Sequence, residues 1–376
     1  MIEDQAGQPL AAEPAQAPVG GPSEEIEGLL LRVAEVGASD LHLKAGSPPA
    51  LRVDGALSIL GDLPPLEGED IEGMLEQIAT AKQMRDFREN LELDFSYALP
   101  GVARFRVNAG MQRETLTLVL RRLSLTIPKI EELGLPELCK DLAMKPRGLI
   151  LVTGPTGSGK STSLAAMIQY INEHDARRVI TIEDPIEYVF EDQRCLITQR
   201  ELGVDTHSFS SALKHALRQD PDVILVGEMR DLETIATALT AAETGHLVLS
   251  TLHTVSAALT VDRVIDVFPP HQQQQVRTQL ASIIEGVLSQ TLLPRADGEG
   301  RVAAIEVMVA TSAVRNLIRE AKTHQLAGVI ETSSRVGMQT LDQALAKLLG
   351  DETITLDEAL AKAGNPRQLK QLIGAA

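Results

Sequence analysis

The segment from Gly148 to Thr162 constrains the fold of this chain more than any other stretch. Leu149–Val152 is a short apolar run, typical of a buried parallel strand. Gly154–Ser161 then matches the pattern G-x-x-x-x-G-K-[ST], and Leu164–Ile171 continues as an apolar helix face. A strand, a glycine-rich loop and a helix in this order predict an α/β sheet with a phosphate-binding loop at its edge.

The residue types of this loop suit phosphate chemistry. Gly157 and Gly159 allow backbone N–H groups to turn inward without a Cβ in the way. Lys160 reaches the β- and γ-phosphates, and Ser161 offers a hydroxyl to Mg²⁺. The sequence therefore predicts a nucleoside triphosphate site. Its loop residues are Gly154, Pro155, Thr156, Gly157, Ser158, Gly159, Lys160, Ser161 and Thr162.

Composition limits the other classes of function. The net charge of −17 and the pI near 5.0 argue against a nucleic-acid partner, which would require a basic footprint. The two cysteines, Cys139 and Cys195, are too few for a structural zinc site, and we do not expect a disulfide between them. No run approaches the length of an apolar membrane span, and no signal-peptide pattern is evident. We therefore expect a soluble, cytoplasmic protein.

The pattern of the chain predicts two domains of different class. Alternating apolar residues, as in Arg104–Asn108 and Thr115–Leu120, surround a helical stretch at 71–88 and indicate an α+β domain with an antiparallel sheet. A tail rich in alanine and proline precedes it, and a proline-containing linker follows it. The predicted boundaries are 1–22 for a disordered tail, 23–125 for the α+β domain, 126–134 for the linker and 135–376 for an α/β domain with a C-terminal helical region.

The second domain shows the strand–helix alternation of a parallel sheet. Val179–Ile182, Val223–Val226 and Leu247–Leu249 are short apolar runs separated by helical segments. Together with the strand before the loop, they predict a mostly parallel sheet covered by helices. After Thr254 we expect mainly helix, interrupted by one strand at Val302–Val307.

Charged residues and histidines flank these predicted strands, where open α/β sheets hold their ligands. An enzyme that hydrolyses a triphosphate needs a carboxylate near Mg²⁺ and a group that activates water. Three acidic clusters favour such a role, although a lone acidic residue after a strand is often only a helix cap. The histidines are either sensors or packing residues, and the arginines either neutralise phosphate or pair with carboxylates. These candidates are Glu183, Asp184, Glu187, Glu228, Asp231, His246, His253, Arg218 and Arg230.

Four motifs in the second domain together resemble those of the secretion ATPase superfamily. Residues 153–162, 180–188, 216–231 and 242–254 are similar to its Walker A, Asp box, Walker B and His box. Ala-Val-Arg-Asn-Leu-Ile-Arg-Glu at 313–320 and Gly-Met-Gln-Thr-Leu-Asp at 337–342 narrow the resemblance to the twitching-motility, or retraction, ATPases of the type IV pilus. The resemblance covers Ser23 to Leu349. The chain departs from the family in its N-terminal tail and in Val314, where isoleucine is usual.

This resemblance implies a RecA-like ATPase domain, an N-terminal PAS-like domain and a homo-hexameric ring that uses ATP and Mg²⁺. Glu187 matches the glutamate proposed as the base, and Glu228 matches the Walker B glutamate. Glu228, directly or through water, and Ser161 would then hold Mg²⁺. The implied catalytic residues are Lys160, Glu183, Glu187 and Glu228. Those implied to contact the nucleotide outside the loop are Arg104, Arg106, Arg113, Arg218, Arg230, His246 and His253.

Three functions remain open at this point. The first is a motor that retracts pili by acting on a platform protein of the inner membrane, at its cytoplasmic face. The second is a motor for pilus extension or for type II-like secretion, although extension motors usually carry a four-cysteine zinc motif. The third is a regulatory subunit that binds ATP without turning it over, which the intact Lys160, Ser161, Glu187 and Glu228 argue against.

Two arginines in the 313–320 motif also predict a contact. Arg315 and Arg319 lie four residues apart and share a helix face, and no acidic residue stands three or four positions from either on that helix. Arg315 also falls in the first turn, where the helix dipole disfavours a cation. We therefore expect an acidic partner in another subunit, in the rest of the fold or in the platform protein.

Overall fold

The computed structural model describes residues 24–53, 55–123 and 126–374, so the predicted disordered tail lies outside the described residues. The chain divides into two compact units, Met1–Leu125 and Thr126–Ala376.

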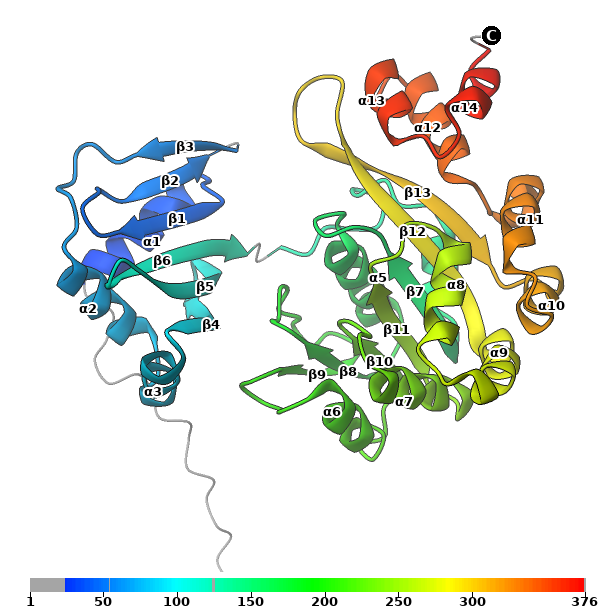
Figure 1. Ribbon diagram of the computed structural model, residues 1–376, viewed down its shortest axis with the longest axis horizontal. Helices are drawn as coiled ribbons and strands as arrows, with labels where there is room; N and C mark the ends of the chain where they lie inside the picture. The colour runs from blue at the N-terminus through cyan, green and yellow to red at the C-terminus, as the bar shows by residue number, and fades with distance from the viewer. Residues whose placement is uncertain (1–23, 54, 124–125, 375–376) are drawn as a thin grey trace, which may run out of the picture. The chain divides into compact units, whose positions relative to one another are not determined.

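The first unit is an antiparallel sheet with helices on one face. Its six strands follow the order β3-β2-β1-β6-β5-β4 (Figure 1). Helices α1, α2 and α3 supply apolar side chains to the core beside the sheet. The elements are α1 (Glu24–Glu35), β1 (Asp40–Lys44), β2 (Ala50–Val53), β3 (Ala56–Ile59), α2 (Gly68–Ile78), α3 (Ala81–Asn90), β4 (Glu92–Leu99), β5 (Ala103–Gln112) and β6 (Thr115–Leu123).

The alternation that predicted this sheet corresponds to its two faces. On β5, Phe105 and Val107 are fully buried in the core, whereas Arg106 on the opposite face is exposed. The helical stretch expected at 71–88 is instead two helices. Thr80 separates them because its side chain and that of Gln83 form a capping box that begins α3.

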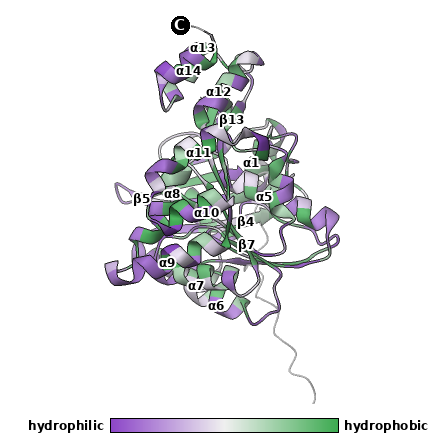
Figure 2. Ribbon diagram, turned by 90° about the vertical axis from the view of Figure 1, so that its right-hand side faces the viewer, coloured by the Kyte–Doolittle hydropathy of each residue, from purple (hydrophilic) through white to green (hydrophobic). Residues whose placement is uncertain are grey.

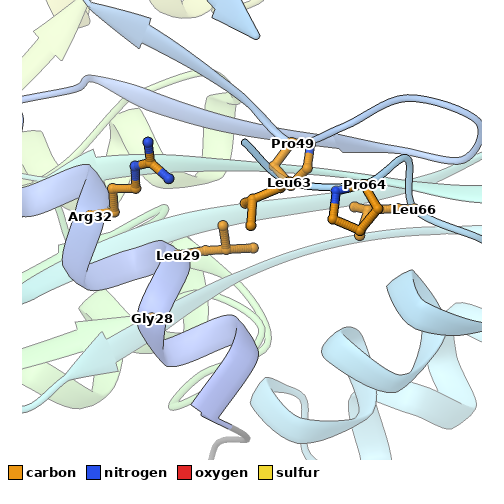
Figure 3. A pocket seen from close by; sticks show the side chains of 7 residues that line it. All are labelled: Gly28, Leu29, Arg32, Pro49, Leu63, Pro64 and Leu66. Atoms are coloured by element: carbon orange, nitrogen blue, oxygen red, sulfur yellow. The ribbon is translucent and has the colours of Figure 1, made fainter. Parts of the chain in front are cut away.

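A pocket of about 250 Å³ lies on the first unit beside α1. Figure 3 shows that α1 faces segments which lead into β2 and α2. Arg32 at its rim pairs with Asp62 at 2.7 Å, and the other lining residues carry no charge. None of the lining residues is one that the sequence linked to a nucleotide. The lining residues are Gly28, Leu29, Arg32, Pro49, Leu63, Pro64 and Leu66.

The second unit is a seven-stranded sheet with the order β13-β12-β7-β11-β10-β8-β9. Every neighbouring pair is parallel except β12 and β13, which confirms the predicted mostly parallel sheet. The elements are α4 (Leu138–Ala143), β7 (Gly148–Thr153), α5 (Lys160–His174), β8 (Arg178–Glu183), β9 (Leu196–Glu201), α6 (Phe209–Ala216), β10 (Val223–Val226), α7 (Leu232–Glu243), β11 (Leu247–Leu252), α8 (Ala257–Asp266), α9 (Pro270–Ile283), β12 (Ile284–Pro294), β13 (Arg301–Val309), α10 (Ser312–Arg319), α11 (Leu326–Thr332), α12 (Leu341–Gly350), α13 (Leu356–Lys362) and α14 (Pro366–Leu372).

Helices cover both faces of this sheet, as its continuous apolar strands require. Leu149 and Leu151 of β7 face a core shared with α6 to α11, whereas Ile150 and Val152 face a core shared with α4 and α5. Hydrophobic and hydrophilic residues alternate along helices such as α8 and α10 (Figure 2), because one side of each is buried and the other is not. Helices α12 to α14 form a smaller core beyond the β12–β13 hairpin (Figure 1).

Strand β12 corrects one expectation, because we predicted mainly helix after Thr254 apart from Val302–Val307. The predicted strand exists within β13, but Ile284–Pro294 is a second strand that the sequence did not reveal. Its three leucines and its one glutamine suit helices as well as strands. Pairing with β7 on one side and β13 on the other decides the outcome, since tertiary contacts override local propensity.

The segment expected to be a linker, 126–134, belongs to the second unit in the structure. Ile130 is buried in the core beside α4 and α5, and Ile127 and Leu133 pack against the same core. Among the described residues, no helix combines the length and the apolarity that crossing a lipid bilayer requires.

Candidate nucleotide-binding site

The predicted phosphate-binding loop leaves the carboxyl end of β7 in a conformation that needs its glycines. Gly154, Gly157 and Gly159 have φ values of 139°, 77° and 86°, in the region that favours glycine. At Gly154 space is also limiting, because a Cβ there would lie 2.2 Å from the backbone oxygen of Gln290. The pattern of glycines is therefore required both by backbone conformation and by close approach to a neighbouring strand.

Lys160 and the start of α5 give the loop its positive character. Lys160 is buried, and its Nζ donates to the carbonyl oxygens of Gly154 and Pro155, both at 3.0 Å. Burial lowers the pKa of its ammonium group, while the charges of Glu228 and Glu187 act in the opposite direction. The Ser158 hydroxyl is buried without a partner among the described residues, and Ser161 is exposed in the first turn of α5. This cradle fits a triphosphate held at a helix N-terminus.

Glu228, directly after β10, is held by two basic side chains. Arg230 Nη2 lies 2.7 Å from one carboxylate oxygen, and His253 Nε2 lies 2.9 Å from the other. Burial alone would raise the pKa of Glu228, but the hydrogen bond and charge of Arg230 and the proximity of His253 outweigh it and lower this pKa. Glu228 is therefore a carboxylate at neutral pH, with both oxygens engaged.

The glutamate that ends β8, Glu183, and the one that follows it, Glu187, have different surroundings. Glu183 accepts hydrogen bonds from Thr181 Oγ1 at 2.5 Å and from Gln199 Nε2 at 3.1 Å. Burial, opposed by these two bonds, raises the pKa of Glu183 to about 7. Glu187 is only half-buried, makes no side-chain hydrogen bond within the described residues, and lies near enough to Lys160 for its charge to influence the pKa of that ammonium group. Glu187 is thus the less constrained carboxylate of the pair.

A chain of hydroxyl groups lies next to the end of β7, where the loop begins, and no sequence pattern predicted it. Thr153 Oγ1, at the end of β7, lies 2.8 Å from Ser289 Oγ of β12. Thr260 Oγ1 of α8 lies 3.4 Å from Thr153 Oγ1 and 2.6 Å from Thr254 Oγ1. Thr254 follows His253 directly. Single hydroxyl residues within apolar strands carry no pattern, so only the fold shows that they meet.

Two predicted site residues lie at the opposite edge of the sheet from the loop. His246 precedes β11, so the whole strand separates it from His253, and its Nδ1 lies 2.9 Å from the carbonyl of Ala241. Arg218 follows α6 and is exposed on the segment that leads to the beginning of β10. Both residues precede parallel strands, whereas the loop follows one, and neither joins the group around Lys160 in its own unit.

Two of the acidic candidates have simpler surroundings. Asp231 begins α7 as its N-cap, because its carboxylate accepts from Thr234 N at 2.8 Å and from Thr234 Oγ1 at 2.7 Å. Asp184 is exposed and contributes to the electrostatic surroundings of Arg230. Asp231 is therefore a helix cap, the alternative considered for an acidic residue after a strand. In the first turn of α5, Thr162 Oγ1 lies 3.0 Å from the Tyr188 hydroxyl.

The predicted arginines of the first unit occupy one face and one turn of its sheet. Arg104 and Arg106 lie on the β5 face opposite the core, and Arg106 lies 4.0 Å from Asp94. Arg113 is in the turn between β5 and β6, with φ of 47°. Arg106 and Arg113 are both exposed.

The expected acidic partner of α10 exists for one of its two arginines. Arg315 Nη2 lies 2.8 Å from Glu285 Oε1, and Nη1 donates to the carbonyls of Ala281 and Ser282 at the end of α9. Of the three locations considered, the partner of Arg315 is in the rest of the fold. Arg319, on the same helix, is exposed.

These features define the class of protein. A phosphate-binding loop lies at the carboxyl end of a mostly parallel sheet, with Lys160 at its base and Glu228 and Glu187 nearby. This is the site of a P-loop nucleoside triphosphatase. The family described as "Type II/IV secretion system protein" matches residues 102–299, and the chain belongs to this family. It is an ATPase with a RecA-like domain.

Individual relatives match nearly the whole chain. The "Type IV pilus retractation ATPase PilT" of Pseudomonas aeruginosa is 53% identical over 342 residues, which are 91% of this chain and 99% of the relative. The "Twitching motility protein" of Neisseria gonorrhoeae is 50% identical, over 85% of this chain and 86% of the relative. A crystal structure of "the Pilus Retraction Motor PilT and Bound ADP" has 48% identity and a TM-score of 0.86, and covers 93% of this chain and 98% of that one.

Proposed function

We propose that this protein is the ATP-driven motor of type IV pilus retraction, the process that underlies twitching motility. The observation that carries the proposal is the similarity at 53% identity to a pilus retraction ATPase over 99% of that relative. The intact phosphate-binding loop and the carboxylates near Lys160 support turnover, and argue against a subunit that only binds ATP.

The residues of the site then take distinct roles in hydrolysis. Lys160 neutralises charge that builds up on the β- and γ-phosphates, and the N–H groups of the loop and of α5 orient them. Ser161 and Glu228 would hold Mg²⁺, the carboxylate either directly or through water. A metal ion held there would supply Lewis-acid stabilisation of negative charge on the phosphates. His253 and Arg230 fix the two oxygens of Glu228 in place.

Glu187 is the carboxylate that we propose as the general base. A base must be ionised and must have a free oxygen within reach of the attacking water. Both oxygens of Glu228 are engaged by basic side chains, and Glu183 is held in place by hydrogen bonds from Thr181 and Gln199. Glu187 has neither restriction within the described chain, and its charge acts on Lys160.

We further propose that the protein works as a homo-hexamer with a PAS-like first unit. In such a ring, Arg104, Arg106 and Arg113 complete the nucleotide site across a subunit interface. Arg106 on its sheet face and Arg113 at the hairpin turn are exposed, which supports this role because a neighbouring molecule can reach them. Guanidinium groups are suited to bidentate contacts with phosphate.

The motor acts, in this proposal, on a platform protein at the cytoplasmic face of the inner membrane. Helix α10 offers one means of contact. Arg315 is committed to Glu285 and to the end of α9, whereas Arg319 points its charge outward from the same helix. Arg319 is therefore the better candidate for an acidic surface on the partner.

Deletion of the gene in the source organism tests the retraction function. We expect cells that carry abundant surface pili but do not move by twitching, because extension continues without retraction. Complementation with the wild-type gene should restore movement, and complementation with Lys160→Ala should not. Cells without surface pili would instead indicate an extension motor and would overturn the proposal.

A further inference from the structure

Gln290 of β12 lies against the phosphate-binding loop. Strand β12 runs parallel to β7, and Ser289 pairs with Thr153, the last residue of β7. Gln290 therefore stands where β7 ends and the loop begins. It is 2% exposed, although its side chain is polar.

Three contacts join Gln290 to both ends of the loop. Its Nε2 donates to the carbonyl oxygen of Ser158 at 2.6 Å. Its backbone oxygen is the group that excludes any Cβ at Gly154, and its Nε2 lies 3.2 Å from where a Cβ of Gly159 would be. The loop thus lies against Gln290 at Gly154 and Gly159. Between them, the Ser158 carbonyl accepts a hydrogen bond from the Gln290 side chain.

The hydrogen bond to Ser158 determines the orientation of one peptide group. In a planar trans peptide, the carbonyl of Ser158 and the N–H of Gly159 point in opposite directions. When Gln290 holds the carbonyl, the N–H of Gly159 points away from β12. That N–H lies immediately before α5, where backbone donors contact a bound anion. The orientation cannot reverse without loss of a buried hydrogen bond.

We propose that Gln290 is a positioning residue of the nucleotide site: it holds the Ser158 peptide so that the Gly159 N–H remains directed at the phosphates. The role requires a donor on the side chain, because a carbonyl oxygen only accepts. The Gln290 Oε1 atom has no partner among the described residues, so the donor Nε2 provides the one side-chain hydrogen bond that the structure records. The inference rests on the ATP site and does not depend on the pilus function.

Gln290→Met tests the proposal, because methionine keeps the length of the side chain and removes the donor. The contact would act on bound ATP and on the transition state alike, so its loss should raise KM with little change in kcat. We expect KM for ATP and Kd for ADP to rise by about 3- to 10-fold. Thr291→Val is the matched control, because successive side chains of a strand point to opposite faces. It should keep both constants.

Gln290→Glu provides a readout that a purely structural role would not affect. At pH 8 a carboxylate next to the Ser158 carbonyl repels it, and ADP should bind more weakly than to Gln290→Met. As the pH falls to 6, the carboxyl gains a proton, becomes a donor and should recover part of the affinity. Unchanged KM and Kd in Gln290→Met, or a fall in kcat alone, would overturn the proposal.

Two further variants keep the result interpretable. If Gln290→Met does not fold, Gln290→Asn keeps an amide that is one methylene short, and wild-type affinity in this variant would refute the role. Lys160→Ala separates this inference from the ATP site itself. Loss of turnover in Lys160→Ala with wild-type behaviour of Gln290→Met rejects Gln290 alone, whereas wild-type turnover in Lys160→Ala rejects the site.

Discussion

The two edges of the parallel sheet differ in chemistry although the same strands form both. At the carboxyl edge, the loop after β7 carries Lys160, and Glu228 and His253 meet after β10 and β11. At the amino edge, Arg218 and His246 precede β10 and β11 and serve the ends of helices or face solvent. Charged residues are thus found at both edges, but only one edge brings them together around a loop that binds phosphate.

The difference has a physical basis. In a parallel sheet all strands end at the same edge, so side chains that follow different strands converge there. Helix α5 also begins at this edge, and its unpaired N–H groups and dipole favour an anion. The amino edge receives the C-terminal ends of helices such as α7, whose carbonyls attract donors such as the His246 ring. Variants at the two edges should therefore differ in their effect on ATP turnover.

Lys160→Ala should have the largest effect on turnover. The change deletes a cation that acts on the phosphates, and we expect ATP hydrolysis to fall by about 1,000-fold while the oligomeric state stays that of the wild type. Lys145→Ala is the matched control, because Lys145 precedes β7 at the amino edge and pairs there with Glu285 at 3.4 Å. It should keep nearly normal turnover. Phosphate-release assays and size-exclusion chromatography measure both, and equal activities in the two variants would contradict the comparison.

The second prediction separates the two carboxylates of the carboxyl edge. If Glu187 is the base, Glu187→Gln should bind Mg-ATP almost normally and hydrolyse it about 100-fold more slowly or worse. Glu228→Gln should instead raise the Mg²⁺ concentration needed for half-maximal turnover, because it removes the charge of a proposed metal ligand. Nucleotide binding and single-turnover hydrolysis across a Mg²⁺ titration distinguish them. If Glu228→Gln binds normally and only hydrolysis fails, the two roles are reversed.

The third prediction tests whether catalysis at the carboxyl edge also needs an arginine from a neighbouring subunit. If Arg106 completes a neighbour's site, Arg106→Ala should lower turnover by about 10- to 100-fold, the size of a lost charge-assisted contact. A mixture of Arg106→Ala with Lys160→Ala should then recover activity at interfaces that pair an intact loop with an intact arginine. Subunit exchange is verified with labelled chains. Exchanging mixtures without recovery would place the arginine in its own subunit's site or outside it.

How much of this the sequence could predict depends on the kind of signal. The loop at Gly154–Ser161 was predictable because close contact with phosphate permits few residue types, and the sheet was predictable from its apolar runs. The order of residues along the chain also carried unused information: His246 precedes its strand and His253 follows it. Strand β12 and Gln290 were not predictable, because long-range pairing and burial decided their roles.

The two histidines allow the edges to be compared directly. His253→Ala removes a partner of Glu228 and should lower kcat/KM by about five- to tenfold. His246→Ala removes a contact with the Ala241 carbonyl and should lower thermal stability slightly while turnover stays near wild type. Steady-state kinetics and thermal melts on both variants measure the contrast. A greater kinetic loss in His246→Ala would mean that the amino edge also contributes to catalysis.

The last effect concerns stability at the carboxyl edge and its dependence on pH, rather than turnover. Burial raises the pKa of Glu183 to about 7, so between its ordinary value of 4.5 and this value the folded state binds more protons than the unfolded state. The stability linked to this proton is present below pH 4.5 and is lost as the pH rises through about 7.

Glu183→Gln cannot ionise and still accepts from Thr181 and Gln199 through its amide oxygen. Glu183→Gln should therefore be more stable than wild type at pH 8, by up to about 3 kcal/mol or a few degrees in Tm. Near pH 5 the two proteins should differ little. Melts without nucleotide at both pH values measure this, with the exposed Glu191→Gln as control. An equal difference in Tm at pH 5 and pH 8 would show that Glu183 does not titrate in this window.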